Sequence, residues 1–316
     1  WSFYIENDDF SAKRLAGVAR AAGGEWATQA SWAYGLASWR LKDYAAAFEA
    51  FDSVARLAAN DDLKAAGLFW SARAAIAAKQ PQQVQPRMQQ AAKLPETFYG
   101  LLASESLGME PIAKKAAKIS KLDWNALKNE KNALLAVALT EVGQTKLAEE
   151  ALRHQAKIGD AAQHANLAQL AGSLNLASTQ YWMGHYGPSR DQSNAMARYP
   201  MPNWEPTGGW RVTPSLVYAH ALQESTFRTD VISPAGARGL MQVRPGTAQD
   251  IARARGNSFV ASELDRPSVN LEYGQSYLEK LRDMPSTGGL LPKVIAAYNA
   301  GPTPLARWNL EIRDNG

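Results

Sequence analysis

Glu224 is the residue whose type and position most directly suggest chemistry, because it lies alone within the apolar stretch HALQESTF. In a helix, Val217, His220 or Ala221, and Glu224 share one face, since residues three, four and seven apart lie above one another. Burial would disfavour the charged form of the carboxyl and raise its pKa, which suits a general acid near neutral pH. The apolar residues expected to bury it are Leu222, Phe227, Leu240 and Met241. The alternative is a salt-bridged or exposed Glu near a helix C-terminus.

Four short motifs follow Glu224-Ser225 in order along the chain. They are SPAGARGLMQ (233–242), PGTA (245–248), NLEYGQSYL (270–278) and AYNAGP (297–302). Gly236 and Gly239 are expected to permit a tight turn and a close approach of the backbone. The amide of Gln242 can both donate and accept a hydrogen bond, which suits recognition of a polar ligand.

Helices are expected to position these motifs. Thr213 and Pro214 are typical of a helix start, with Thr as N-cap and Pro in the first turn, so the first helix should span 214–225. Further helices are expected from Pro245 to Gly256, from Ser268 or Asn270 over 268–284, and over 290–301. No stretch alternates with a period of two, so the whole chain is expected to be all-α.

The region before these helices also has the apolar spacing of helices. Residues 1–80 are expected to form an array of helix pairs, in which Gly35, Tyr44, Ala47 and Phe51 resemble part of a tetratricopeptide-type pair. We expect three domains: a helical repeat (1–80), a helical continuation or linker (81–200), and a domain bearing the motifs (201–316). The Pro/Gly/aromatic stretch 198–210 is the expected connector. Because such arrays usually extend over more repeats, we expect Trp1 to follow a removed or absent segment.

Composition narrows the possible functions. The 316 residues carry a net charge of +4 with no basic block, which argues against nucleic-acid binding. There is no Cys, and the four His show no metal-binding spacing, so neither a metal nor a cofactor is expected. No apolar run is long enough to cross a membrane. Ten Trp and eleven Tyr could stack on sugar rings, although most of them are expected to pack helices together.

The ordered motifs Glu-Ser, Gly-Leu-Met-Gln and Ala-Tyr-Asn resemble those of the soluble lytic transglycosylase (SLT) family over residues 224–302. The upstream helices resemble the superhelical ring and linker of its large ring-shaped members. The resemblance implies a goose-lysozyme-like catalytic domain that cleaves the β-1,4 bond from N-acetylmuramic acid to N-acetylglucosamine in peptidoglycan. It also implies the periplasm of a Gram-negative bacterium, with attachment to the outer membrane only through an N-terminal lipid anchor.

The same resemblance implies that Glu224 acts alone, although glycosidases usually use two carboxylates. Glu224 would first protonate the glycosidic oxygen and then act as base on the muramoyl C6 hydroxyl, which attacks its own C1 and leaves a 1,6-anhydro end. The partners implied are glycan strands and stem peptides, and other cell-wall enzymes through the helical repeats. The residues expected to contact substrate are Ser225, Ser233, Gly239, Leu240, Met241, Gln242, Arg244, Tyr298 and Asn299.

Structural alternatives stand beside these roles. Ser225 could be a helix-end hydroxyl, Ser233 a turn residue, and Tyr298 a core aromatic. Arg244 stands where family members often have Met, and it could bind a muramoyl or peptide carboxylate or simply face solvent. The family's acidic-Thr-Arg-x-Tyr-Val segment after Ala-Tyr-Asn does not occur before Gly316. The rival functions are a goose-type lysozyme that uses water, and a non-catalytic glycan-binding module.

Overall fold

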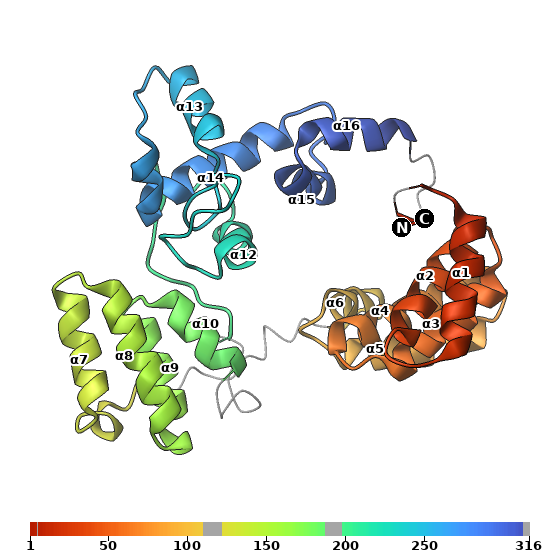
Figure 1. Cartoon of the computed structure of the whole chain (residues 1–316), viewed down its shortest axis with the longest axis horizontal. Helices are drawn as coiled ribbons and strands as arrows, with labels where there is room; N and C mark the ends of the chain where they lie inside the picture. The colour runs from red at the N-terminus through yellow and green to blue at the C-terminus, as the bar shows by residue number, and fades with distance from the viewer. Residues whose placement is uncertain (5, 110–121, 187–197, 312–316) are drawn as a thin grey trace. The chain divides into compact units, whose positions relative to one another are not determined.

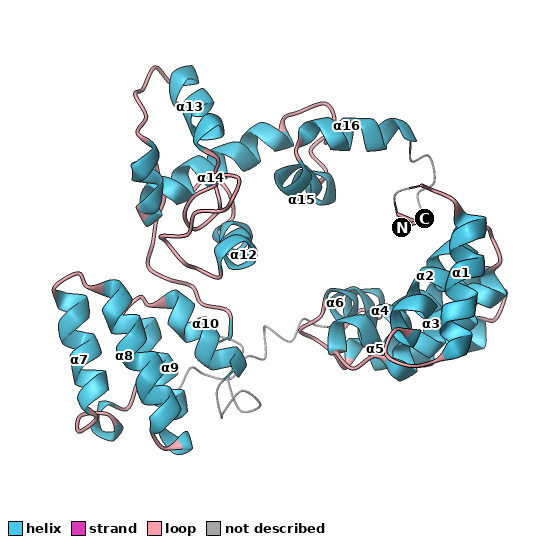
Figure 2. Ribbon diagram, viewed as in Figure 1, coloured by secondary structure: helices cyan, strands magenta, loops and turns pink. Residues whose placement is uncertain are grey.

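The computed structural model describes residues 1–4, 6–109, 122–186 and 198–311. Over these ranges the regular structure is helical, with no β-strand, as the sequence predicts (Figure 1, Figure 2). The chain divides into two compact units, made of residues 1–116 and 117–315. The three domains expected from the sequence, with boundaries at residues 80 and 200, stay a prediction.

The first unit is a series of helices joined by short turns: α1 (Asp9–Ala22), α2 (Ala27–Arg40), α3 (Tyr44–Leu57), α4 (Asp61–Ala77), α5 (Val84–Ala92) and α6 (Phe98–Ser106). Side chains cap the starts of α1, α3, α4 and α6, whereas α2 and α5 have no side-chain cap. The Oδ1 atom of Asn60 accepts a hydrogen bond from the amide of Leu63 at 2.8 Å, and Asp43 likewise caps α3. These caps fix where the capped helices begin.

Small residues let the helices of the first unit pack closely. A Cβ atom at Gly67 on α4 would lie 2.6 Å from the amide nitrogen of Ala55 on α3, so only glycine fits there. Trp32 and Trp39 both meet Trp70 edge to face, with ring centroids 6.5 and 5.5 Å away. These tryptophans therefore pack the helices together, which is one of the two roles that the sequence allows for them, the other being stacking on sugar rings.

The second unit begins with helices α7 (Lys131–Glu141), α8 (Thr145–Ile158), α9 (His164–Ser173) and α10 (Ala177–Tyr186). Their core is built on Leu127, Leu152, Leu167 and Met183, each at most 1% exposed. Ala177, at the start of α10, belongs instead to the core of the helices that follow. Part of α10 thus packs with the domain that carries the motifs.

That domain contains α12 (Pro214–Ser225), α13 (Pro245–Ala254), α14 (Pro267–Arg282), α15 (Leu291–Ala300) and α16 (Pro302–Glu311). The bounds of α12 match the sequence prediction, although the Thr213 hydroxyl at the N-cap makes no capping hydrogen bond. Helix α13 ends two residues before Gly256, and α14 begins one residue before Ser268. In both cases a proline provides the start, because its fixed φ suits the first turn of a helix.

The core of this domain holds the long turn between α12 and α13 against α14. Leu240 and Met241 from the turn are fully buried, together with Leu264, Leu271 and Leu281. Burial of this much apolar surface is the main force that positions the turn. Among the described residues, no helix is both long and apolar enough to cross a membrane.

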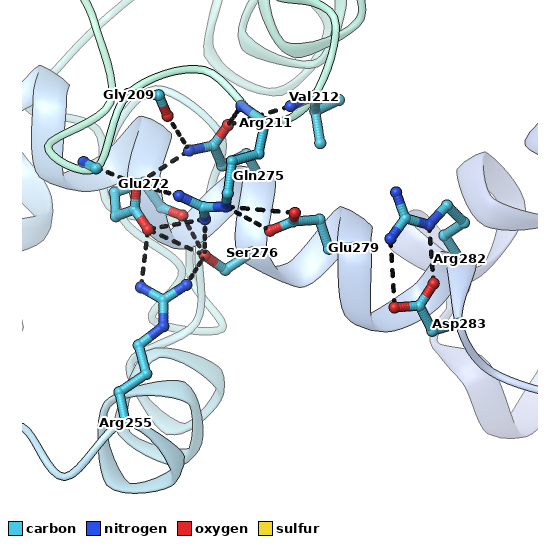
Figure 3. Close-up of polar contacts among 11 residues, drawn as sticks. Gly209, Arg211, Val212, Arg255, Glu272, Gln275, Ser276, Glu279, Arg282 and Asp283 are labelled. Carbon is cyan, nitrogen blue, oxygen red and sulfur yellow. Dashed lines mark hydrogen bonds and ion pairs between the residues drawn. The ribbon is translucent and has the colours of Figure 1, made fainter.

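Glu272 on α14 anchors the segment before α12 (Figure 3). Its carboxylate accepts hydrogen bonds from Arg211 at 2.9 Å, from Arg255 at 2.8 Å and from the amide of Gly208 at 3.1 Å. Burial alone would raise the pKa of Glu272, but hydrogen bonds from the two arginines and from Gln275 outweigh it and hold the pKa to about 2. The network ties the connector, α13 and α14 into one frame.

Candidate active site

Glu224 lies in the last turn of α12, where the chain bends sharply. Thr226 and Phe227 directly after it have φ values of 54° and 62°, in the left-handed region that residues other than glycine rarely adopt. Their amides donate to the carbonyls of Leu222 and Ala221, and the Phe227 side chain is buried in the core. This closed helix end fixes the position of Glu224.

Glu224 lines a cleft of about 330 Å³ between α12 and α15. The cleft is lined by Leu216, Ala219, His220, Gln223, Glu224, Ile295, Ala296, Tyr298 and Asn299. Of the described residues that line the cleft, only Glu224 carries a carboxylate. A polymer in the cleft would therefore meet a single acidic group in a largely apolar wall.

Burial raises the pKa of Glu224, whose side chain is half-buried. The pKa of the Tyr298 hydroxyl is also raised, mainly by burial and then by the charge of Glu224. A carboxyl with a raised pKa keeps its proton to higher pH than a solvated one. The cleft thus favours the state in which Glu224 can donate a proton.

The residues that bury Glu224 differ in part from those expected. Leu240 and Met241 are 0% exposed and belong to the core, whereas Leu216 and Ile295 line the cleft itself. The Met241 side chain points at α14, where a Cβ atom on Gly274 would lie 2.2 Å from its Sδ atom. Leu240 and Met241 therefore belong to the core beneath the turn and do not line the cleft.

Tyr298 joins two of the motifs. Its hydroxyl donates a hydrogen bond to the main-chain carbonyl of Met241 at 2.8 Å. Its ring contacts those of His220 and Tyr277, with centroids 4.7 and 5.3 Å away. Ala-Tyr-Asn on α15 is thereby fixed to Gly-Leu-Met-Gln in the turn, and both face α12.

The turn depends on a glycine and on a buried amide. Gly239 has φ of 70°, and a Cβ atom there would lie 2.3 Å from both Nδ2 of Asn270 and the carbonyl oxygen of Leu264. Asn270 is fully buried, donates to the carbonyls of Arg238 and Leu264, and accepts from the amide of Met241, each at 2.8 Å. This one side chain satisfies three main-chain groups of the turn and its surroundings.

The side-chain amide of Gln242 binds main-chain carbonyls of the turn, whereas the sequence suggested that it would bind a ligand. It adopts φ of 47°, and its Nε2 donates to the carbonyls of Gly239 and Val231 at 2.9 and 3.1 Å. Both amide hydrogens are thus used within the protein, which leaves the carbonyl oxygen Oε1 for any ligand. The role of Gln242 in substrate binding stays a prediction.

The remaining predicted residues lie in varied surroundings. Ser225 is buried and donates to the carbonyl of Ala221, as a helix-end hydroxyl does. The Ser233 hydroxyl accepts from the amide of Ala237 within the turn. Arg244 and Asn299 are exposed, and only Asn299 is among the residues that line the cleft. Substrate contacts of these residues stay predictions.

Sequence reasoning assigned no function to His220, which the structure places in the cleft wall beside Tyr298. Its position one turn before Glu224 on the same apolar face was the available signal. Over the described ranges, no group of three or more acidic, His or Cys side chains could hold a metal ion.

Comparison with known proteins agrees with this geometry. Residues 203–315 match the family model of the transglycosylase SLT domain. The recognition made from the motifs is confirmed, and this part of the chain is an SLT domain. The soluble lytic murein transglycosylase of Escherichia coli is 37% identical over 105 residues, which cover 32% of this chain and 16% of the relative. The endo-type membrane-bound lytic murein transglycosylase A of Klebsiella pneumoniae is 39% identical over 117 residues, or 34% of this chain and 57% of that protein.

Solved structures extend the likeness to the upstream helices. An inactive mutant of the lytic transglycosylase Slt from Pseudomonas aeruginosa matches with a TM-score of 0.71 and 24% identity, over 90% of this chain and 46% of that chain. The 70 kDa soluble lytic transglycosylase of Escherichia coli matches with a TM-score of 0.65 and 24% identity, over 83% and 43%. This likeness establishes the fold, so the predicted helical array followed by a lysozyme-like domain is confirmed.

Proposed function

We propose that this protein is a lytic transglycosylase that cleaves the β-1,4 bond between N-acetylmuramic acid and N-acetylglucosamine in peptidoglycan. The observation that carries the proposal is the single half-buried carboxyl of Glu224, with a raised pKa, in the cleft of an SLT domain. The named relatives are lytic murein transglycosylases. The proposed location is the periplasm of a Gram-negative bacterium.

In the proposed mechanism Glu224 acts twice. The protonated carboxyl donates its proton to the glycosidic oxygen as the bond to C1 breaks. The resulting carboxylate then accepts the proton of the muramoyl C6 hydroxyl, whose oxygen bonds to C1 and closes the 1,6-anhydro ring. Because the nucleophile belongs to the substrate, no second carboxylate is needed to activate water. Glu224 regains its proton, so the cycle balances.

Digestion of purified peptidoglycan tests the proposed reaction, with the masses of the released muropeptides measured by mass spectrometry. A transglycosylase gives anhydro ends, which are lighter by one water than the reducing ends that a goose-type lysozyme gives. Reducing ends alone would refute the proposed ring closure and leave a hydrolase of the same fold.

Replacement of Glu224 tests its role. Glu224→Gln keeps the shape of the side chain but cannot donate an acid proton, so we expect turnover to fall about 1,000-fold, which is typical for loss of general acid catalysis. Asp250→Asn, an exposed carboxylate on α13, is the matched control and should retain activity. Equal turnover in Glu224→Gln and wild type would contradict the assignment, and glycan binding without turnover in the wild type would indicate a non-catalytic module.

A further inference from the structure

His220 carries a buried polar atom that the mechanism above does not use. The side chain is 7% exposed, and its Nε2 atom has no hydrogen-bond partner among the described residues. Leaving a buried acceptor unpaired costs free energy, so such atoms are rare in folded proteins. An unpaired nitrogen one helical turn from Glu224 calls for a physical explanation.

The other ring nitrogen fixes which atom carries the hydrogen. Nδ1 lies 2.8 Å from the carbonyl oxygen of Leu216, which can only accept, so Nδ1 is the donor. In the neutral ring, Nε2 is then an acceptor. Burial lowers the pKa of His220, which keeps the ring neutral around physiological pH. Nε2 therefore needs a donor.

Glu224 is placed to supply that donor. It follows His220 by four residues, so the two residues are neighbours on one face of α12, and a Glu224 rotamer that leans over the preceding turn would bring its carboxyl toward Nε2. Both side chains line the same cleft, and Glu224 is half-buried there. Among the described residues, Tyr298 on α15 contacts the His220 ring and has its pKa raised in part by the charge of Glu224, and Tyr277 on α14 contacts the ring of Tyr298. Tyr298 already donates to Met241.

We propose that His220 is a positioning residue for Glu224: its Nε2 accepts a hydrogen bond from the protonated carboxyl, which favours the protonated form between turnovers. No covalent bond changes, because the proton stays on the carboxyl and only a hydrogen bond forms. After proton donation, the carboxylate has nothing to donate to Nε2 and is free to turn toward the cleft. This proposal rests on the proposed function and deepens it.

A carboxyl titration tests the proposal independently of catalysis. In the full chain, the Glu224 side chain would be followed by ¹³C NMR in wild type and in His220→Phe, which keeps a flat ring against Tyr298 but removes the acceptor. We expect the apparent pKa of Glu224 to fall by about one unit in His220→Phe, the effect of one hydrogen bond to the acid form. The amide oxygen of His220→Gln restores an acceptor and should recover part of the shift.

A second measurement needs no variant of His220. In the wild type, the ¹⁵N signal of His220 Nε2 should move in step with protonation of Glu224. An unchanged apparent pKa of Glu224 in His220→Phe would overturn the proposal. A ¹⁵N signal of His220 Nε2 that does not change as Glu224 is protonated would overturn it too. If Glu224 titrates as expected but peptidoglycan is not cleaved, the proposed function fails and the pairing of His220 with Glu224 stands.

Discussion

Replacing Glu272 with Gln should destabilise the second unit strongly, because it removes the charge that two arginines bind. The wild-type pKa of about 2 lies roughly 2.5 units below the ordinary value of 4.5. One unit corresponds to about 1.4 kcal/mol, so the ionised carboxylate stabilises the folded state by about 3 kcal/mol. The side chain is only 10% exposed, so solvent screens little of this interaction. We expect Glu272→Gln to lower the free energy of unfolding by about that amount at pH 7.

The dependence on pH has a definite sign. The pKa of Glu272 is lower in the folded state, so its contribution is complete above about pH 4.5 and is lost as the pH falls toward 2. Wild type and Glu272→Gln should therefore converge in stability at pH 2. Glu279→Gln is the control, since Glu279 also contacts Arg211 but is 24% exposed and should lose less than about 1 kcal/mol.

Hydrogen exchange of the α14 amides, read by mass spectrometry, reports the opening free energy of this unit separately from the first. The measurement would be made at pH 7 on the three proteins, and urea unfolding would extend it to acid pH. A loss below about 1 kcal/mol in Glu272→Gln at pH 7, or a difference that persists at pH 2, would show that the arginines do not hold Glu272 as described.

Two further predictions concern the cleft. Gly239→Ala should lower stability by about 2 kcal/mol or more and reduce peptidoglycan turnover, because its Cβ would overlap Asn270 and the carbonyl of Leu264. Thermal unfolding measures the stability and the digestion assay measures the turnover. Wild-type values in both would contradict the geometry. Tyr298→Phe should lower the free energy of unfolding by about 1 kcal/mol, because the carbonyl of Met241 loses its donor. The protein should stay folded, and turnover should fall more than this loss of stability implies. Unchanged turnover would argue against a role of Tyr298 in positioning the turn.

Local sequence signals predicted much of the fold. Pro214 marked the start of α12, and Gly301 the end of α15, because the conformational preferences of these residues act within one turn. Gly239 was expected at a tight turn for the same reason. Such features need no knowledge of distant contacts.

Features that depend on distant contacts could not be predicted in this way. The end of α12 at Thr226 and Phe227 lacks a glycine, and burial of Phe227 in the core offsets the unfavourable φ values. Asn270 was recognised as part of a motif, but its three main-chain partners come from residues up to 32 positions away. The sequence also placed Met241 beside Glu224, whereas the structure turns its side chain toward Gly274.

The hydrogen bonds that hold the turn between α12 and α13 bear on which residues of this domain can change during evolution. Asn270 and Tyr298 both bind the turn through its main-chain atoms, namely the carbonyls of Arg238 and Met241 and the amide of Met241. Main-chain atoms are present whatever side chain a residue carries. Exposed side chains of the turn, such as that of Arg244, are therefore free to change during evolution while the backbone beside Glu224 keeps its position. If the proposed function holds, preference for different glycan or peptide groups can vary by substitution of such exposed side chains while Glu224 keeps its place.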